Sequence, residues 1–269
     1  MMESEAAPTV VLITGANTGL GFETVKALLQ SPRKYTILLG GRDVAKAERA
    51  ANAAASEIPS HSIVQHFQID VEDDSSIAKA YENIAAKYTT IDCIINNAGA
   101  SFDSCIEKGT MTPREAWSKT WDVNVTGAHI VTTTFLPLLL RSRDPRLLFI
   151  TSGLSSLGEN SKGDPRYPPP PAGLPKKPSM FMAYRSAKAG LNMMMLEWTR
   201  MLKNDGVKVW ALAPGLLATG LGDDVEVLKK LGAVEPSVGG NVVRSVVEGA
   251  RDSDSGMAIR EYKSPIQPW

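Results

Sequence analysis

Near its amino terminus the chain carries a short apolar run, then a glycine-rich turn, then a helical pattern. Thr9–Ile13 is apolar and rich in β-branched residues, which predicts a fully buried strand. Thr14–Gly21 follows with the spacing G-x-x-x-G-x-G, and the helical pattern runs to Leu29. A strand, a glycine turn and a helix in this order aim backbone N–H groups at one point, which favours a bound phosphate. A plain tight turn would also need glycines, so both interpretations stay open for this stretch alone.

The alternation of strand and helix continues along the whole chain. We expect strands at residues 9–13, 35–39, 62–69, 91–95, 147–150, 207–213 and 257–262. We expect helices at 19–29, 44–57, 73–88, 112–141, 181–203 and 237–250, and a shorter helical segment at 225–231. Strands and helices that alternate in this way form a parallel sheet covered on both faces. The sequence therefore predicts a doubly wound α/β fold of about seven strands, with residues 1–269 as a single domain.

Ligands of such sheets bind beyond the carboxyl ends of the strands, and four candidate residues follow predicted strands there: Gly15, Arg42, Asp70 and Asn97. A carboxylate at the tip of the second strand would hold the ribose 2′-OH of NAD, whereas an arginine suits the 2′-phosphate of NADP. Arg42 occupies the tip, and Asp43 is placed to cap the next helix. We therefore expect NADPH rather than NADH. The other interpretation of Arg42 is a solvated loop residue.

Composition argues against several other classes of function. Lys+Arg and Asp+Glu both total 29, so no net charge points to nucleic acid or an anionic membrane. The two cysteines lack CxxC spacing, and Cys93 lies in an apolar run where a small buried side chain is expected. The three histidines show no metal-ligand spacing, so we expect no metal. Without a signal segment in Met1–Pro8 or an apolar run long enough to span a bilayer, a cytoplasmic location is expected.

Tyr184 and Lys188 lie four residues apart in a predicted helix, so they share one face. A phenol has an ordinary pKa of about 10, too high for ready proton exchange at neutral pH. A nearby ammonium favours the phenolate, so we expect Lys188 to lower the pKa of Tyr184 and make it a general acid or base. The same pair occurs on many solvated helices, and by itself it is weak evidence.

A proline-rich insertion at residues 153–178 interrupts the alternating pattern. It holds Pro168–Pro171 and further prolines at positions 165, 175 and 178, so we expect neither a helix nor an inner strand there. A structureless loop of this length in a compact domain is usually functional or disordered. A lid beside the active site and a plain surface insertion both remain open.

Seven motifs follow one another along the chain: Thr14–Gly21, Asp70-Val71, Asn96–Gly99, Asn124, Ser152, Tyr184-x-x-x-Lys188 and Pro214-Gly215-x-x-x-Thr219. Together they resemble the short-chain dehydrogenase/reductase family over nearly the whole chain. The strand tip Gly41–Asp43 and the long insertion are most similar to the carbonyl-reductase branch, and Gln267–Trp269 is similar to fungal members. The resemblance implies a Rossmann fold and an NADP-dependent oxidoreductase that acts on an alcohol–carbonyl pair.

By position, the resemblance implies a catalytic tetrad of Asn124, Ser152, Tyr184 and Lys188. Tyr184 would donate a proton to a carbonyl oxygen as NADPH delivers hydride to its carbon, and Ser152 would hold that oxygen. Lys188 would also bind the nicotinamide ribose, and Asn124 would fix a water that links Lys188 to solvent. The implied cofactor-binding residues are Gly15, Asn17, Thr18, Gly19, Leu20, Gly21, Arg42, Asp70, Val71, Asn97, Ala98, Gly99, Tyr184, Lys188, Pro214, Gly215 and Thr219.

The resemblance also implies how part of this set divides along the cofactor. Asp70 would contact the adenine, Asn97 and Gly99 the ribose on the adenosine side, and Thr219 the carboxamide. The cofactor carries the redox chemistry, while these residues orient and polarise it.

Two positions depart from the family pattern. NADP-preferring relatives often carry a basic residue where this chain has Thr18, so Arg42 would bind the 2′-phosphate with less help. Ser152 and Tyr184 are 32 positions apart, whereas most relatives have a much shorter connection. The extra chain would lie beside the helix that relatives commonly use to dimerise, so we expect a monomer.

The leading hypothesis is an NADPH-dependent reductase of a ketone or an aldehyde, with a small-molecule carbonyl substrate and no nucleic-acid or membrane partner. One alternative is an NADP(H)-binding sensor without turnover, although such a protein has no need of the complete tetrad. Another is an alcohol dehydrogenase in the oxidative direction, which uses the same residues. A specialised biosynthetic reductase of one large, aromatic intermediate also fits. A fold does not determine the substrate.

Overall fold

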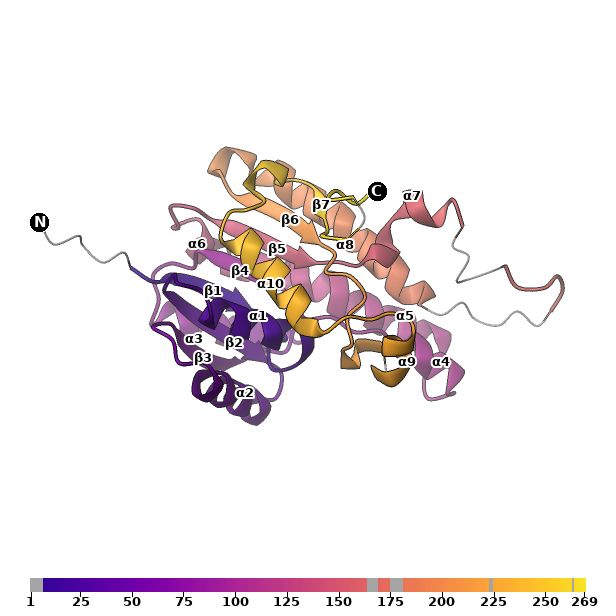
Figure 1. The fold of residues 1–269 in the computed structure, drawn as a ribbon, viewed down its shortest axis with the longest axis horizontal. Helices are drawn as coiled ribbons and strands as arrows, with labels where there is room; N and C mark the ends of the chain where they lie inside the picture. The colour runs from indigo at the N-terminus through magenta and orange to yellow at the C-terminus, as the bar shows by residue number, and fades with distance from the viewer. Residues whose placement is uncertain (1–6, 164–168, 175–180, 223–224, 263) are drawn as a thin grey trace, which may run out of the picture.

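A seven-stranded sheet forms the centre of the molecule (Figure 1). The computed structural model describes residues 7–163, 169–174, 181–222, 225–262 and 264–269. Within these residues the strands are β1 (Thr9–Ile13), β2 (Tyr35–Gly41), β3 (Ile63–Gln68), β4 (Cys93–Asn96), β5 (Arg146–Ile150), β6 (Lys208–Leu212) and β7 (Ala258–Ile259). They lie in the order β3-β2-β1-β4-β5-β6-β7, and all neighbouring pairs are parallel. The predicted doubly wound α/β fold is confirmed.

The strand order changes direction between β1 and β4, which are neighbours in the sheet. The chain leaves β1 towards one edge and leaves β4 towards the other, so the loops after these two strands diverge. The glycine turn starts at this point, where the N–H of Thr14 still donates to the carbonyl oxygen of Ile95 at 3.1 Å. The topology therefore places the turn at the ligand-binding crevice of a Rossmann fold.

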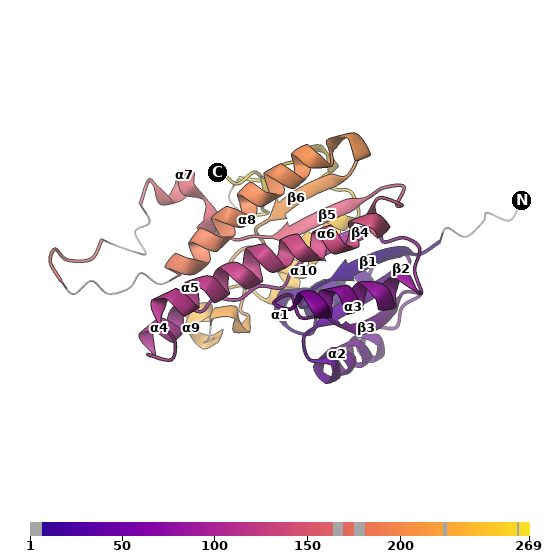
Figure 2. The same cartoon turned by 180° about the vertical axis from the view of Figure 1, so that it is seen from behind.

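Helices cover both faces of the sheet and pack on it through two apolar clusters. The helices on the face seen in Figure 1 are α1 (Gly19–Leu29), α2 (Val44–Glu57) and α10 (Pro236–Val247). Those on the opposite face, seen in Figure 2, are α3 (Asp74–Ala85), α6 (Gly127–Leu139) and α8 (Met182–Met201). The helix α5 (Pro113–Trp121) runs into α6 through a π-helical turn, Asp122–Thr126.

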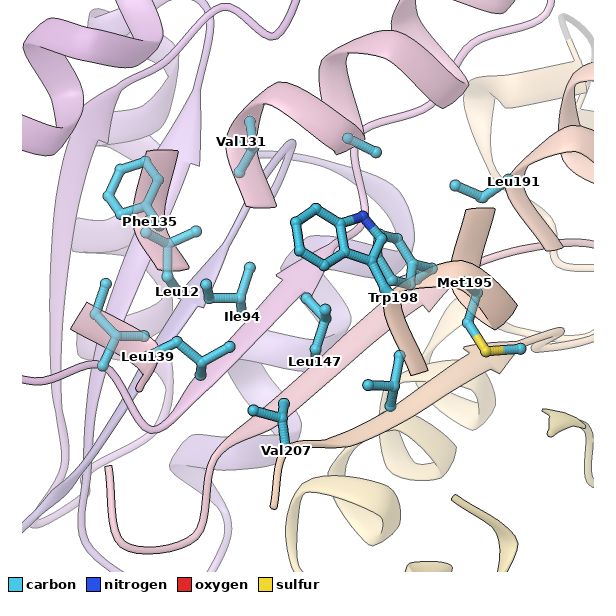
Figure 3. Close-up of a cluster of buried hydrophobic side chains, with 14 of the residues drawn as sticks. Leu12, Ile94, Val131, Phe135, Leu139, Leu147, Leu191, Met195, Trp198 and Val207 are labelled. Atoms are coloured by element: carbon cyan, nitrogen blue, oxygen red, sulfur yellow. The ribbon is translucent and has the colours of Figure 1, made fainter. Parts of the chain in front are cut away.

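The cluster under α6 and α8 fixes the helix that carries the tyrosine motif. Figure 3 shows its side chains, from the sheet, from α6 and from α8: Leu12, Ile94, Leu147, Val131, Phe135, Leu139, Leu191, Met195 and Trp198. Each of these is at most 3% exposed, and burying one such side chain contributes roughly 1.5–3 kcal/mol. Because the cluster spans the middle and the carboxyl-terminal half of α8, packing there sets the position of Tyr184 and Lys188 in its first two turns.

The predicted proline-rich insertion begins with two short helices. A 3₁₀ turn, Gly153–Ser155, is followed by α7 (Leu157–Asn160), whose amino end is capped by Ser156. The expectation that no helix forms in 153–178 is therefore wrong for its first part, because the prolines that forbid a helix begin only at position 165. The following predicted features lie outside the described residues: residues 1–6, Pro165, Pro168, Pro175 and Pro178.

Shorter elements complete the fold. They are α4 (Asp103–Glu107), α9 (Val225–Lys230) and 3₁₀ turns at Lys203–Asp205, Gly220–Gly222 and Asp252–Asp254. Among the residues described above, no helix is both long enough and apolar enough to cross a bilayer.

Candidate active site

The glycine turn and the start of α1 form one side of the site. Gly15 has a φ of +61°, and a Cβ on it would stand 2.9 Å from the Cα of Ala98, so the close approach of these two loops requires glycine. Thr18 precedes α1 but makes no side-chain capping bond, and the first turn of the helix holds no acidic residue. The helix therefore presents N–H groups that its own side chains leave uncapped, which fits a pyrophosphate.

Asn97 ties the loop after β4 to the glycine turn. Its Nδ2 donates to the carbonyl oxygens of Thr14 at 2.8 Å and Gly15 at 3.0 Å. In return, the Thr14 hydroxyl accepts the N–H groups of Asn97 at 3.1 Å and Ala98 at 3.0 Å. We predicted a ribose contact for Asn97, and the structure shows that its amide N–H groups already hold the turn.

The other predicted cofactor residues are brought to the same edge of the sheet. Thr219 lies over the turn, because its Cγ2 is 3.5 Å from the point where a Cβ of Gly19 would stand. Gly215 has a φ of +97°, a conformation that favours glycine. Asp70 accepts the N–H of Glu72 at 3.1 Å through Oδ1. Four more of the predicted residues lie against glycines: Asn17 against Gly41, Leu20 and Pro214 against Gly239, and Val71 against Gly127.

Arg42 directly follows β2, at the strand tip where the sequence analysis expects it. Its side chain is 71% exposed, and Nη1 is 3.4 Å from Oε2 of Glu72. The same carboxylate lies 3.3 Å from the ammonium of Lys119. Asp43 caps α2 as predicted, accepting the N–H of Lys46 at 3.0 Å. An exposed guanidinium with one long ion pair has most of its donors available for an anion.

Asn124 lies in the π-helical turn between α5 and α6. We predicted one long helix through residues 112–141, and the structure shows that the helix widens by this turn where Asn124 enters the site. Asn124 is 1% exposed, and its Nδ2 donates to the carbonyl oxygens of Thr120 and Ala100, both at 2.7 Å. Its Oδ1 is 2.9 Å from the point where a Cβ of Gly99 would stand and has no hydrogen-bond partner in the structure. A buried acceptor of this kind suits a water molecule.

Ser152 and Tyr184 meet at the end of β5. Ser152 begins the 3₁₀ turn, and its Oγ accepts the N–H of Leu154 at 3.2 Å. Tyr184 is 6% exposed. Burial raises the pKa of Tyr184 to about 12, and a hydrogen bond with the Ser152 side chain acts in the opposite direction. The phenol is therefore a protonated group at neutral pH.

Lys188 lies below the tyrosine ring. Its Nζ donates to the carbonyl oxygen of Ile150 at 2.8 Å and lies 5.6 Å from the centroid of the Tyr184 ring. Burial lowers the pKa of Lys188 to about 7. The expectation that Lys188 lowers the pKa of Tyr184 is wrong for the protein alone. Burial lowers the pKa of Lys188, so less of this group is charged, and burial is also the main cause of the raised pKa of Tyr184.

Asp103 is a residue that the sequence reasoning missed. It is 8% exposed and lies in α4, yet its two carboxylate oxygens accept the N–H groups of Ala183 at 2.8 Å and Tyr184 at 3.1 Å. Phe181, the residue before α8, has a φ of +65° and provides no side-chain cap. Asp103 therefore caps the helix in its place. No local signal marks this role, because the two partners are 80 positions apart in the chain.

The four predicted tetrad residues come together in the structure. The Ser152 side chain acts on the Tyr184 phenol, Nζ of Lys188 lies 5.6 Å from the centroid of its ring, and Gly99 lies between Lys188 and Asn124. A carbonyl oxygen placed at Ser152 and Tyr184 would meet two hydroxyl donors. The arrangement can therefore stabilise a developing alkoxide and protonate it.

Known proteins resemble the chain in sequence and in structure. The family model of the short chain dehydrogenases matches residues 9–163, more than half of the chain. The short-chain dehydrogenase/reductase eupG of a Phoma species is 48% identical over 278 residues, which cover 100% of both chains. The short-chain dehydrogenase/reductase tropE of Talaromyces stipitatus is 44% identical, with 96% of this chain and 97% of the relative covered. The expected similarity to fungal members is confirmed.

Two solved structures share the fold over nearly its full length. NADPH-bound carbonyl reductase from chicken fatty liver superposes with a TM-score of 0.78 at 22% identity, covering 98% of this chain and 100% of the other. Pseudomonas aeruginosa RhlG in complex with NADP superposes with a TM-score of 0.75 at 20% identity, covering 95% of each chain. From its family-model match and its fungal relatives, this chain belongs to the short-chain dehydrogenase/reductase family of oxidoreductases.

Proposed function

We propose that the protein is an NADPH-dependent oxidoreductase that reduces a ketone or an aldehyde to an alcohol, with Tyr184 as the general acid. The observation that carries this proposal is a buried, protonated phenol beside the Ser152 side chain. A phenol whose pKa is raised to about 12 is protonated at neutral pH, which is the form that a carbonyl reduction needs. In the oxidative direction the same residue would act as a base, and the assay below distinguishes the two directions.

Bound NADPH supplies the hydride. The chain's own contribution begins with Ser152, whose hydroxyl holds the carbonyl oxygen in place. Tyr184 then transfers its proton from Oη to that oxygen as negative charge develops. Lys188, with its pKa near neutrality, accepts and returns a proton readily, and the free Oδ1 of Asn124 fixes the water that connects it to solvent.

The residues present fit a dinucleotide phosphate. Gly15 and Gly19 adopt positive φ values that let the backbone approach a ligand closely, and the start of α1 carries no side-chain cap. Arg42 would bind the 2′-phosphate, for which its exposed guanidinium is suited. The structural relatives described with NADPH or NADP support the same choice of cofactor.

An assay of cofactor oxidation tests the proposal. Purified protein is mixed with NADPH or NADH and a panel of ketones and aldehydes, and absorbance at the nicotinamide band is followed. We expect turnover with NADPH on at least one carbonyl. Tight NADPH binding with no oxidation on any carbonyl would support the sensor instead. Turnover of alcohols with NADP, and of no carbonyl with NADPH, would support an oxidative dehydrogenase.

Tyr184→Phe tests the assigned acid. General acid catalysis contributes about 10²–10⁴-fold, so we expect a loss of turnover in this range while NADPH binding by fluorescence changes little. Tyr88→Phe is the matched control, because its hydroxyl bonds Gln65 at 2.7 Å on β3, away from the tetrad. Turnover retained by Tyr184→Phe would show that another group supplies the proton.

A further inference from the structure

Behind Ser152 lies a buried network of polar side chains that belongs to none of the seven motifs. Its members are Thr151, Ser155, Asn192 and Gln267, each at most 4% exposed. The Ser155 hydroxyl donates to the carbonyl oxygen of Ser152 at 2.6 Å. It accepts from Nδ2 of Asn192 at 2.9 Å and from Nε2 of Gln267 at 3.0 Å. These three bonds use the one proton and both lone pairs of the hydroxyl.

Gln267 reaches this network from residues 264–269, which fold back along β7. Its own N–H donates to the carbonyl oxygen of Ala258 at 2.8 Å, and Ile266 forms an antiparallel bridge with Ile259. Two residues further on, the carbonyl oxygen of Trp269 accepts the N–H of Gly158 at 2.5 Å. The backbone is therefore held on both sides of Gln267, so its side chain points into the network from a fixed base.

We propose that Gln267 is a positioning residue for the catalytic serine; this inference rests on the proposed function. Its Nε2 donates to the carbonyl oxygen of Ser152 at 3.3 Å as well as to Ser155. The carbonyl of Ser152 thus accepts the N–H of Ser155 at 3.0 Å, the Ser155 hydroxyl and the Gln267 amide, and together these bonds fix the peptide that follows the Ser152 side chain. Without the Gln267 donor, this partly buried carbonyl and the Ser155 hydroxyl each lose a bond, and the turn gains freedom.

The same network connects the serine to the tyrosine helix. Asn192 lies in α8, one turn after Lys188, and its Oδ1 accepts the hydroxyl of Thr151 at 2.6 Å. Thr151 and Ser155 therefore link the end of β5 and the turn after it to α8 through the Asn192 side chain. A correct distance between the two hydroxyls that bind the carbonyl oxygen depends on this link. A misplacement of about 1 Å can cost about 100-fold in rate.

Gln267→Met tests the proposal, since methionine has a similar length and no donor. We expect kcat to fall about 10–100-fold. The KM for NADPH should stay within about two-fold of the wild-type value, because the cofactor contacts are untouched. Hydrogen exchange at the Leu154 amide, which bonds the Ser152 hydroxyl, should become faster. Gln30→Met is the matched control, because Gln30 is exposed at the end of α1, and it should change none of these quantities.

A kcat within about two-fold of wild type, with unchanged exchange at Leu154, would overturn the proposal. So would a loss of kcat that only follows the folded fraction. If the wild-type protein reduces no carbonyl, the proposed function fails, whereas the exchange measurement still decides the role of Gln267. If Gln267→Met does not fold, Ser155→Ala decides by the same readouts, because it removes the shared hydroxyl and adds no volume.

Gln267→Glu adds a pH-dependent test of the Gln267 donor. A neutral carboxyl group donates one hydrogen bond, whereas a carboxylate donates none. The kcat of this variant, divided by that of the wild type, should therefore rise as the pH is lowered. A ratio that does not depend on pH would contradict a role for the donor.

Discussion

Tyr184 and Lys188 show how burial sets the chemistry of single residues. Removal from water disfavours the charged form of each group, so it raises the pKa of the phenol to about 12 and lowers that of the amine to about 7. Both changes favour a neutral pair in the protein alone. A neutral phenol is the form that a carbonyl reduction consumes, so the site is already in the protonation state that donation requires.

At the residue scale, Arg42→Asp should change the choice of cofactor. The substitution replaces an exposed cation that suits the 2′-phosphate with a carboxylate that suits a ribose 2′-OH. Hydrogen bonds to charged groups are worth about 1.5–3 kcal/mol, so the ratio of kcat/KM for NADPH to that for NADH should fall at least about 10-fold. Steady-state kinetics with both cofactors measure this ratio.

The matched control for Arg42 is Arg141→Asp. Arg141 is also an exposed arginine, but it follows α6 and donates to the carbonyl oxygen of Thr89. Both residues precede strands, β5 and β4, and so lie at the amino-terminal ends of the strands, away from the site. This variant should keep the wild-type ratio. An unchanged ratio in Arg42→Asp would show that another residue reads the 2′-phosphate.

At the scale of elements, the start of α8 depends on a carboxylate from α4. Asp103→Ala should reduce the free energy of unfolding by about 0.5–2 kcal/mol, the usual cost of a lost cap. Because one of the two freed N–H groups belongs to Tyr184, kcat should fall as well. Urea denaturation and steady-state kinetics measure the two effects.

Thr112→Ala serves as the control for this cap. Thr112 caps α5 through the N–H of Glu115 at 3.3 Å, on a helix whose first turn carries no tetrad residue. It should cost a similar free energy of unfolding and leave kcat unchanged. Equal kcat values for the two cap variants would show that Asp103 does not contribute to catalysis.

Some elements could be read from the sequence, and others could not. The strands β1 and β4 are apolar runs that only a buried sheet can accept, so their prediction needed no tertiary information. The π-helical turn brings Asn124 to Ala100 and Gly99, and no local pattern reports these contacts. The helix α7 was missed because the prolines after it dominated the interpretation of the whole insertion.

The candidate site also has features that the sequence predicts and features that it does not. Its positions were predictable, because each motif follows a strand whose carboxyl end lies at one edge of the sheet. Contributions from residues distant in the sequence were not predictable. Asp103 and Gln267 act through partners at least 80 positions away, and the pKa of Tyr184 depends on burial, which a sequence does not give.

At the scale of the whole molecule, the amino-terminal ends of β5 and β6, opposite the site, are held by ion pairs. Arg146 at the start of β5 contacts both carboxylate oxygens of Asp252, at 2.6 and 3.0 Å, and Lys208 contacts the same group at 2.6 Å. The hydrogen bond from Arg146 is the main cause that lowers the pKa of Asp252 from 3.8 to about 2. Folding thus releases a proton from this carboxyl group between these two values.

The free energy of unfolding should therefore depend on pH through the titration of Asp252. Because its pKa is lower in the folded state, its contribution is complete above pH 3.8 and is lost as the pH falls towards 2. The urea midpoint of the wild type should fall over this range, and Asp252→Asn should flatten that dependence. Asp205→Asn, at an exposed aspartate, is the control and should keep the wild-type slope. The same slope for Asp252→Asn would contradict the assignment.

The expected oligomeric state also belongs to this scale. The insertion before Tyr184 would lie beside the helix that relatives commonly use to dimerise, so we predict a monomer. Size-exclusion chromatography with light scattering at several concentrations measures the mass directly. A stable dimer or tetramer at low protein concentration would contradict this prediction.

The carboxylate of Asp103 has a consequence for how the chain can diversify. Since it caps α8 from a segment 80 positions upstream, the stretch that joins α7 to Tyr184 need not orient the phenol. That stretch is free to lengthen, shorten or be exchanged between lineages while the reacting groups keep their places. New substrate preferences could then arise by grafting one loop onto an unchanged catalytic frame.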